Sequence, residues 1–391
     1  MKLSKELVND LPRRWTRIRK QMELAKADAC LLSGTENLFY ATGMVFSGYF
    51  YLPLSGDPLY FVKRPVGLSG DNVIYIRKPE QIPEALTENG FELPDVVMLE
   101  SEELSHADWC RLENAMKPAR AISGTPAIRI ARSVKTAYEI GQFKLSAQYH
   151  TEVYNQIPSL YRPGMTDLEF SVAIEGAMRL KGCLGMVRVF GTSMEIFMGS
   201  ILTGDNAAAP SPYDFALGGG GLHPSIPVGA NGSLLESGKT VMVDVGGNFT
   251  GYITDMTRVF AIGDLPEHAY RAHQVALEIQ NRIVEMAGPG VRAEDLYDEA
   301  VAIATRNGLA DCFMGAEQQA KFVGHGIGIE LNELPVLSTR SNDILEEGMV
   351  FALEPKFIIA GVGAVGIENS FVVTASGIEK ITLSKEEIIR L

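Results

Sequence analysis

The chain has 391 residues, which is too long for one small core and suits two domains. Apolar residues make up 46% and charged residues 21%, as is typical of a soluble globular protein, and the net charge of −13 argues against nucleic acid or an anionic membrane as a partner. The four cysteines lie far apart, which predicts free thiols in a reducing compartment. Neither a signal peptide nor a membrane span is predicted, so a cytoplasmic location is expected.

The first third of the sequence alternates between helix and strand patterns. A helical mix of apolar and basic residues runs from Arg14 to Ala27. Short apolar runs then predict four strands, at Ala29–Gly34, Pro58–Arg64, Asn72–Ile76 and Asp95–Leu99. This alternation is typical of an α/β domain in which helices cover a sheet.

The pattern changes close to Arg132, where we expect a domain boundary. A strand in this region is predicted to give way to a long helix that has Ser133 as its N-cap. The expected division is therefore a first domain over residues 1–132 and a second over residues 133–391.

Two more helices are predicted in the second domain. Met165–Gly182 carries Thr166 as an N-cap, and Glu169 three residues later completes a capping-box pattern. A third helix is expected at Pro266–Ala287. Segments rich in Val, Ile and Phe dominate the rest, and they predict strands separated by glycine-rich loops.

Thr240–Gly263 predicts a β-hairpin, because VMVDV and YITDMTRVF have strand composition and flank the turn GGNFTG. Asp244 and Asp255 lie five or six residues from that turn on its two sides, which places them near each other across the strands. Two like charges so placed repel each other unless a cation lies between them, and aspartate is also a poor strand former. The pair therefore indicates function, with an exposed hairpin face as the alternative.

A second hairpin of the same form is predicted near the C-terminus. Gly348–Phe357 and Val365–Thr374 predict strands on either side of a loop centred on Gly361. They carry Glu354 and Glu368, each seven residues from that glycine, so two carboxylates again face each other across a hairpin.

A histidine flanked by glycines, His325 in FVGHGIG, lies between the two hairpins in sequence. Glycine has no Cβ, so it lets the backbone bend tightly or lets a ligand come close. Four carboxylates and one imidazole suit a pair of divalent ions, and an oxygen-rich set favours Mn, Co, Fe or Zn. The candidate metal ligands are Asp244, Asp255, His325, Glu354 and Glu368.

This set resembles that of the M24 metallopeptidases, a family that includes methionine aminopeptidase, aminopeptidase P, prolidase and the non-peptidase creatinase. The five candidates match the family's metal ligands one by one, and Arg17–Gly43 resembles the opening of creatinase- and prolidase-type N-terminal domains. The resemblance implies an α+β fold with such an N-terminal domain, a pita-bread catalytic domain and a homodimer. It also implies that a metal-bridging hydroxide attacks an amide carbon while Glu354 moves the proton.

The same resemblance implies residues that contact the substrate. His223 in GGGGLHPSIP would hydrogen-bond the scissile nitrogen or the carbonyl. Asn332 replaces the family's second histidine; it can donate a hydrogen bond to the substrate but cannot act as an acid or base. Gly366 stands where prolidase-like members tend to carry an arginine, so a clamp for the substrate carboxylate is expected to be missing. Lys356 stands where glycine is usual; it either supplies a replacement charge for binding substrate or is solvated.

These features favour a dinuclear metal-dependent hydrolase of Xaa-Pro peptides, either a dipeptidase or an aminopeptidase P-like enzyme. The alternative is a creatinase-like hydrolase of a small non-peptide C–N bond, which Asn332 and Gly366 favour. A catalytically inactive binding module on the same fold is a third hypothesis, and the retention of all five ligands argues against it.

Overall fold

The computed structural model describes residues 3–192 and 194–391 of the chain. It divides into two compact units, Met1–Arg132 and Ser133–Leu391. Within the described ranges, no helix combines the length and the apolar character that crossing a bilayer requires.

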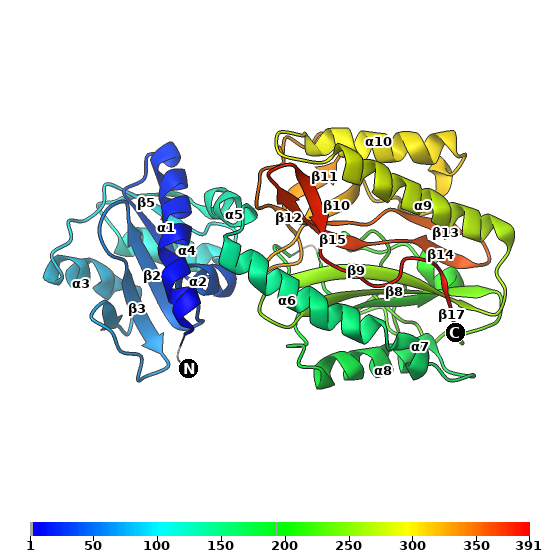
Figure 1. Ribbon diagram of the computed structural model, residues 1–391. Coiled ribbons are helices and arrows are strands. Elements are labelled where there is room, and N and C mark those ends of the chain that lie inside the picture. The colour runs from blue at the N-terminus through cyan, green and yellow to red at the C-terminus, as the bar shows by residue number, and fades with distance from the viewer. Residues whose placement is uncertain (1–2, 193) are drawn as a thin grey trace. The chain divides into compact units, whose positions relative to one another are not determined.

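The first unit is built on a mixed six-stranded sheet in the order β4-β3-β2-β1-β5-β6 (Figure 1). Antiparallel pairs join β1 to β2 and β2 to β3, and the other neighbours are parallel. Its strands are β1 (Ala29–Leu32), β2 (Ser47–Pro53), β3 (Leu59–Arg64), β4 (Val73–Tyr75), β5 (Val96–Leu99) and β6 (Arg120–Ser123). Its helices are α1 (Lys5–Ala25), α2 (Thr35–Thr42), α3 (Ile82–Glu88), α4 (His106–Ala115) and α5 (Thr125–Ser133).

The four strands predicted in this unit are present, with ends that move by one or two residues. The first helix begins earlier than predicted, because Ser4 caps it by accepting a hydrogen bond from the Leu7 amide. Among the helices and strands given above, β2, β6, α2, α3 and α4 were not predicted.

The strand predicted before Arg132 is wrong, because this segment is helix α5. Ile128 and Ala131 are buried whereas Ile130 is 46% exposed, so burial follows the helical period of three to four residues and not the alternation of a strand. The predicted N-cap at Ser133 is also wrong, since that residue ends α5.

The long helix of this region, α6 (Ala137–Tyr154), begins after Thr136. The Thr136 hydroxyl accepts from the Glu139 amide at 3.2 Å, and the Glu139 carboxylate accepts from the Thr136 amide at 2.9 Å. This reciprocal pair is a capping box, which satisfies two amides that the first turn leaves unpaired.

Two predicted helices of the second unit are confirmed. They are α8 (Asp167–Leu180), with the capping box between Thr166 and Glu169, and α9 (Glu267–Met286). The helix α10 (Ala293–Arg306) was not predicted, and its N-cap residue Arg292 makes no side-chain capping bond that could have marked its start. A short helix, α7 (Ile157–Leu160), follows α6.

The strands of the second unit form three sheets, in the orders β17-β9-β8-β7, β11-β10-β12-β15-β16 and β13-β14. The first sheet contains β7 (Gly199–Thr203), β8 (Lys239–Asn248), β9 (Ile253–Ile262) and β17 (Ile389–Arg390). The second contains β10 (Phe322–Gly326), β11 (Glu333–Ser338), β12 (Val350–Leu353), β15 (Asn369–Thr374) and β16 (Gly377–Lys380). The third is the ribbon of β13 (Lys356–Ile359) and β14 (Gly363–Gly366).

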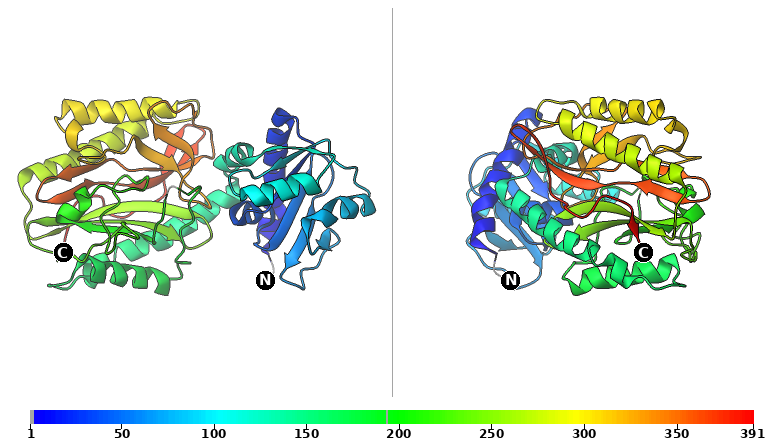
Figure 2. Two further views of the ribbon diagram at one scale, coloured as in Figure 1. Left: turned by 180° about the vertical axis from the view of Figure 1, so that it is seen from behind. Right: turned by 45° about the vertical axis from the view of Figure 1, so that its right-hand side comes forward.

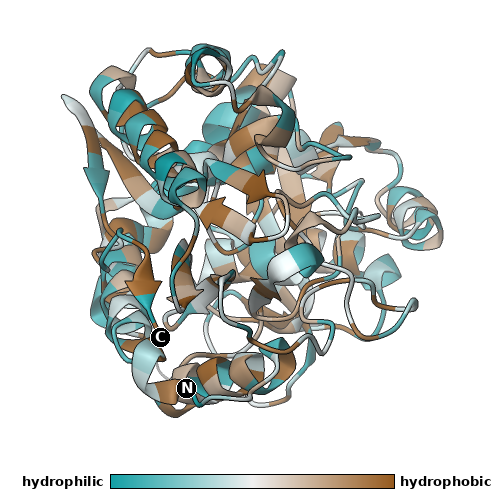
Figure 3. Ribbon diagram, turned by 90° about the vertical axis from the view of Figure 1, so that its right-hand side faces the viewer, coloured by the Kyte–Doolittle hydropathy of each residue, from teal (hydrophilic) through white to brown (hydrophobic). Residues whose placement is uncertain are grey.

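Helices cover the strands of this unit on two sides, with α9 and α10 on one and α6 and α8 on the other (Figures 1 and 2). Two hydrophobic clusters match these layers. One joins α6, α7 and α8 to β8 and β9, and the other joins α9 and α10 to β10, β12, β13, β14 and β15. The helices alternate between hydrophilic and hydrophobic residues along their length, as surface helices that bury one face must (Figure 3).

Candidate metal centre

The two faces of β8 and β9 have different neighbours. Val243 packs in the cluster formed with α6 to α8, whereas Met242 packs with Ile358 and Ala364 of the β13-β14 ribbon. Because successive side chains of a strand point to opposite faces, Asp244 shares the face of Met242 and points toward that ribbon.

The hairpin pattern predicted that Asp244 and Asp255 lie near each other across the strands, and they do so as diagonal rather than directly opposed residues. Asp244 pairs with Thr257, and Asp255 pairs with Gly246, which makes the two aspartates diagonal neighbours on one face. The reason is the turn, which occupies residues 249–252 and so lies closer to Asp255 than the GGNFTG motif indicated.

The two long strands predicted near the C-terminus are each interrupted. Glu354 and Pro355 separate β12 from β13, and Ile367 and Glu368 separate β14 from β15. Proline has no amide hydrogen and cannot continue a ladder, and here its carbonyl accepts from the Ile367 amide at 3.2 Å. Glu354 and Glu368 therefore lie where the hairpin passes from the five-stranded sheet to the ribbon.

His325 lies on β10, between β11 and β12. Its Nε2 is 3.4 Å from Glu354 Oε1 and 3.9 Å from Asp255 Oδ2, so the ring faces carboxylates from two other segments. Its Nδ1 lies 3.2 Å from the carbonyl of Gly326. That contact turns Nε2 toward the carboxylates.

The glycines beside His325 are required by strand packing. A Cβ at Gly324 would lie 2.4 Å from the Ala352 carbonyl oxygen, and one at Gly326 would lie 2.1 Å from the Leu334 carbonyl oxygen. Both contacts are with backbone, which cannot move aside as a flexible side chain can. The glycine pattern that singled out the histidine therefore reflects the close approach of β10 to its neighbouring chain segments.

Five predicted residues meet as two overlapping groups, each with ligand atoms within 4.8 Å of one another. The first group is Asp255, His325 and Glu368, and the second is Asp244, Glu354 and Glu368. Glu368 Oε2 accepts from the Thr257 hydroxyl at 2.6 Å, whereas its Oε1 is buried and has no hydrogen-bond partner among the described residues. An orphaned carboxylate oxygen beside an imidazole fits a divalent cation in the first group.

The second group already contains a cation, the ammonium of Lys356. This side chain is 0% exposed, so the alternative that it is solvated is wrong. Its Nζ donates to Asp244 Oδ2 at 2.8 Å, to Glu354 Oε2 at 2.7 Å and to Glu368 Oε2 at 3.1 Å. Burial lowers the pKa of Lys356, but these three negative charges outweigh it and hold the pKa well above its usual value.

The carboxyl groups still repel one another despite this lysine. Burial, followed by the charges of Glu368, Asp244 and Glu354, raises the pKa of Asp255 well above its usual value. Burial also raises the pKa of Asp244 to about 6, although Lys356 opposes the shift. Asp244 keeps 20% of its side chain exposed and Asp255 only 8%, so desolvation weighs more on Asp255. An additional cation near Asp255 would reduce the repulsion between these carboxylates.

Buried residues outside the five candidate ligands hold the segment around Glu368 in place. Arg258 is 0% exposed and donates to the Glu368 carbonyl at 2.8 Å and to Asn369 Oδ1 at 2.8 Å. The Ser370 hydroxyl donates to the Asp255 carbonyl at 2.8 Å. The arginine was present in the TDMTR motif, so its position three residues after Asp255 was a usable signal.

Two predicted substrate-contacting residues lie outside these groups. His223 is exposed in its loop, where Nδ1 contacts the Ser225 hydroxyl at 2.8 Å and accepts from the Ser225 amide at 3.1 Å. The amide of Asn332 bonds at both ends to the main chain of Phe190, with its Oδ1 accepting at 2.6 Å and its Nδ2 donating at 3.1 Å.

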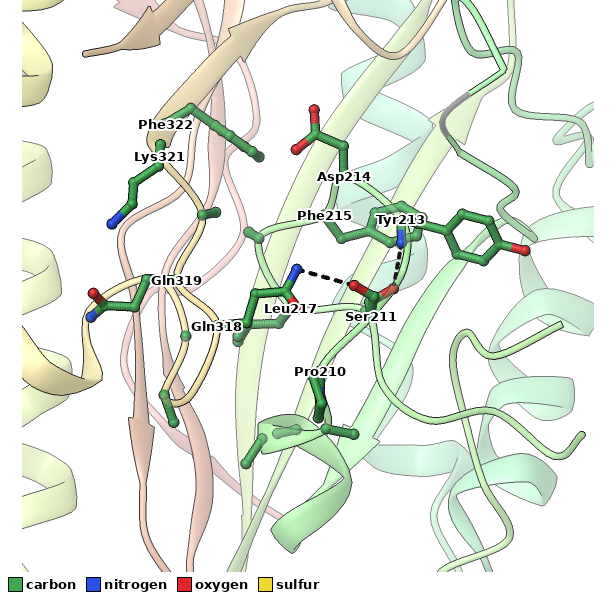
Figure 4. Close-up of a pocket in the computed structure, with 18 of the residues that line it drawn as sticks. Pro210, Ser211, Tyr213, Asp214, Phe215, Leu217, Gln318, Gln319, Lys321 and Phe322 are labelled. Atoms are coloured by element: carbon green, nitrogen blue, oxygen red, sulfur yellow. Dashed lines mark hydrogen bonds between the residues drawn. The ribbon is translucent and has the colours of Figure 1, made fainter. Parts of the chain in front are cut away.

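The second unit contains a pocket of about 370 Å³ (Figure 4). Two segments, Ala207–Gly218 and Gly315–Phe322, form most of its wall. They are joined by a hydrogen bond of 3.1 Å that the side-chain Nε2 of Gln318 donates to the main-chain carbonyl of Ser211. Phe322 in this wall has its ring centroid 6.3 Å from that of His325. Phe322 therefore links the pocket wall to His325, whereas none of the five candidate ligands is itself part of the lining.

Two family models match the chain. Residues 141–375 match that of metallopeptidase family M24, and residues 14–134 match that of the creatinase/prolidase N-terminal domain. A Bacillus subtilis protein with the name uncharacterized peptidase YqhT is 27% identical over 372 residues, which cover 93% of this chain and 96% of that protein. The Xaa-Pro dipeptidase of Pyrococcus furiosus is 31% identical over 185 residues, which cover 47% of this chain and 51% of that protein.

Solved structures agree with these matches. The Xaa-Pro dipeptidase from Bacillus anthracis aligns with a TM-score of 0.79 at 25% identity, over 97% of this chain and 100% of its own. The prolidase from Pyrococcus horikoshii OT3 aligns with a TM-score of 0.76 at 22% identity, over 96% and 100% of the two chains. These likenesses confirm the predicted α+β fold, a creatinase-type domain followed by a pita-bread domain.

Proposed function

Since the chain belongs to metallopeptidase family M24, we propose that the peptides it hydrolyses are of the Xaa-Pro class, cleaved as a dipeptidase or as an aminopeptidase P-like enzyme. The observation that carries this proposal is the convergence of four side chains from four separate segments, those of Asp255, His325, Glu354 and Glu368. Substrate class is supported by the likeness to Xaa-Pro dipeptidases in both sequence and structure.

The same four side chains are proposed to hold a divalent ion, either Mn, Co, Fe or Zn. Carboxylate oxygens and one imidazole suit these ions, and the orphaned Glu368 Oε1 gives such an ion a ready donor. A divalent ion held there supplies Lewis acidity, which favours attack of water on a carbonyl carbon. How many ions the centre holds depends on Lys356, whose ammonium lies within the Asp244 group.

Glu354 is proposed to move the proton. Its side chain is 5% exposed, with one oxygen near His325 and the other accepting a hydrogen bond from Lys356. The contact with Lys356 fixes the orientation of this carboxylate, and an ionised carboxylate can take a proton from an attacking water. The same carboxyl can then give that proton to the departing nitrogen.

His223 and Asn332 are proposed to act on the substrate side. Nδ1 of His223 faces Ser225, so Nε2 is the nitrogen that would meet the scissile nitrogen or the carbonyl. The two bonds from Asn332 to Phe190 support a role in fixing the segment around that phenylalanine, from which Asn332 would still reach substrate as a hydrogen-bond donor.

A creatinase-like reaction on a small C–N bond is the second candidate, and one observation favours it. No arginine stands at Gly366, and the nearby Lys356 has its donors directed at carboxylates of the protein. A clamp for a peptide's carboxylate is therefore not supplied from this ribbon. An inactive binding module is less well supported, because all five candidate ligands are retained and lie together.

The test uses purified protein loaded with Mn²⁺ or Co²⁺. Proline release from Ala-Pro, alanine release from Ala-Pro-Ala and urea release from creatine are measured, each with EDTA and Glu354→Gln controls. Metal-dependent cleavage of a proline peptide that Glu354→Gln abolishes is the expected result. Urea release without peptide cleavage would replace the first candidate by the second, and silence on all three with metal bound would contradict both.

A homodimer in the cytoplasm is proposed as the working form. The dimer is supported by the family resemblance, and the compartment by the four free cysteines, since disulfides are rare where thiols are kept reduced. Sedimentation equilibrium of the full chain tests the dimer, and a mass of one chain at micromolar concentration would contradict it.

A further inference from the structure

The Lys356 ammonium uses all of its hydrogen-bonding capacity inside the candidate centre. An ammonium has three N–H donors, and they go to one carboxylate oxygen each of Asp244, Glu354 and Glu368. These three residues are the whole of the second ligand group. The lysine therefore binds every side chain that would hold an ion in that group.

An ion and this ammonium cannot share the group. Bonds from a divalent ion to carboxylate oxygens are about 2.0–2.2 Å long, which puts such an ion inside the space that the ammonium fills. Lys356 is 0% exposed, and no open surface is available to it without breaking three charge-assisted hydrogen bonds. Displacing the Lys356 ammonium would leave its charge buried without the three carboxylate partners, which is strongly unfavourable.

The ribbon explains how the side chain reaches this place. Lys356 is the first residue of β13 and pairs with Gly366 of β14. A Cβ at Gly366 would lie 2.5 Å from the Pro355 carbonyl oxygen and 2.7 Å from the Lys356 Cα, and its φ of +152° also favours glycine. Glycine at position 366 therefore permits the backbone position from which the Lys356 side chain enters the centre. Lys356 and Gly366, the two residues that differ from the family pattern here, are thus paired across the ribbon.

We propose that the Lys356 ammonium takes the place of one of two divalent ions, so that the centre binds a single ion through Asp255, His325, Glu354 and Glu368. This inference rests on the metal binding of the proposed function but not on its Xaa-Pro substrate. It replaces the expectation of two ions. One consequence is a single class of metal affinity, because the second positive charge is covalently fixed and does not exchange with solvent.

Metal stoichiometry of the wild-type chain is the primary test. Metal-free protein is titrated with Mn²⁺ by calorimetry, and metal content is measured after gel filtration from excess Mn²⁺. One ion per chain, with the electron paramagnetic resonance spectrum of an isolated Mn²⁺, is expected. Two ions per chain, or a spectrum of exchange-coupled ions, would overturn the inference and leave the proposed function intact. Zero ions would overturn both.

Removal of the ammonium supplies a second test. Lys356→Met keeps a similar length without charge and frees the second group, so it is expected to raise the stoichiometry to two ions per chain. The same substitution at Lys144, which pairs with Glu379 at the surface, controls for the loss of a lysine and should leave one ion. Circular dichroism in Mn²⁺ verifies that each variant is folded. A folded Lys356→Met protein that still binds one ion would contradict the inference, and if this variant does not fold, the wild-type stoichiometry decides alone.

Discussion

Buried positive charge is distributed unevenly over the five predicted ligands. Lys356 contacts three carboxylates, whereas Asp255 has three like-charged neighbours and a raised pKa. Electrostatic repulsion is therefore greater at Asp255, beside His325, than at Asp244, which accepts a hydrogen bond from Lys356. Single residues of the set should accordingly differ in what they contribute to metal binding.

Asp244→Asn and His325→Ala should have unequal effects on the affinity for Mn²⁺. His325→Ala removes a ligand of the proposed ion and is expected to weaken binding by about 100-fold or more, beyond the effect typical of outer-shell partners. Asp244→Asn should weaken it by less than about tenfold, because this residue mainly contacts the lysine. Calorimetric titration measures both, and equal losses would mean that Asp244 itself holds an ion.

His150 should make stability depend on pH. Burial, followed by the charge of Arg258, lowers its pKa to about 3 in the folded chain, whereas the unfolded value is about 6.5. The unfolded state therefore binds the extra proton first, so the stabilisation present above pH 6.5 is lost as the pH falls toward 3, by about 1.4 kcal/mol per unit. In urea unfolding from pH 7 to 5, His150→Gln should flatten this slope.

The matched control for that measurement is His268→Gln, at an exposed position on α9. It should keep the wild-type slope. If His150→Gln and wild type lose stability equally on acidification, then the buried histidine is not the source of the pH dependence.

At the scale of elements, breaks in strands and close packing between strands determine where the candidate ligands lie. Strand β12 ends before Glu354 and Pro355, so Glu354 lies at the junction between two sheets. Strand β10 lies so close to its neighbouring segments that only glycine fits on either side of His325. A strand places its ligand in the centre only if its register and its distance from the neighbouring strands are kept. Small changes of backbone volume in β10 should therefore affect both stability and metal binding.

Gly326→Ala tests that dependence. Its Cβ would meet the Leu334 carbonyl oxygen at 2.1 Å, so β10 and β11 must separate and His325 must move. The free energy of unfolding is expected to fall by roughly 1–3 kcal/mol, as for other overpacked sites, and Mn²⁺ affinity should fall with it. Gly141→Ala in α6 is the control, because its Cβ meets nothing within 4 Å and alanine favours the helix. An unchanged Gly326→Ala protein would contradict the packing argument.

For the molecule as a whole, the ion links segments that are far apart in the chain. The proposed ligands come from β9, from β10 and from the two breaks in the C-terminal hairpin, all within Ser133–Leu391. An ion that binds them in the folded state and not in the unfolded chain adds its binding free energy to the stability of this unit.

Metal removal should therefore lower the melting midpoint. At a free Mn²⁺ concentration of 100 times Kd, the expected stabilisation is about 2.7 kcal/mol, equivalent to roughly 5–10 °C for a unit of this size. Calorimetric scans with Mn²⁺ and with EDTA measure the difference. His325→Ala is the control and should show almost no shift, while an equal shift in this variant would place the stabilising ion elsewhere.

The amino-acid sequence by itself determined which residues could carry the chemistry. Aspartates in Val- and Ile-rich strands and a histidine among glycines violate local preferences, and such violations are visible without coordinates. The capping box of α8 was equally local, since Thr166 and Glu169 are three residues apart. Helix α5 was missed because Ile128 and Ile130 alternate as in a strand, and only packing shows that one is buried and the other exposed.

Only the tertiary structure decided how the charges are paired. Lys356 and Asp244 are 112 residues apart, and no sequence pattern relates the ammonium to that carboxylate. Its burial depends on the break at Pro355, on the pairing with Gly366 and on the face of β8 that Asp244 shares with Met242. Sequence periodicity reports on neighbours along one element, whereas the occupant of a buried site is fixed by contacts between elements.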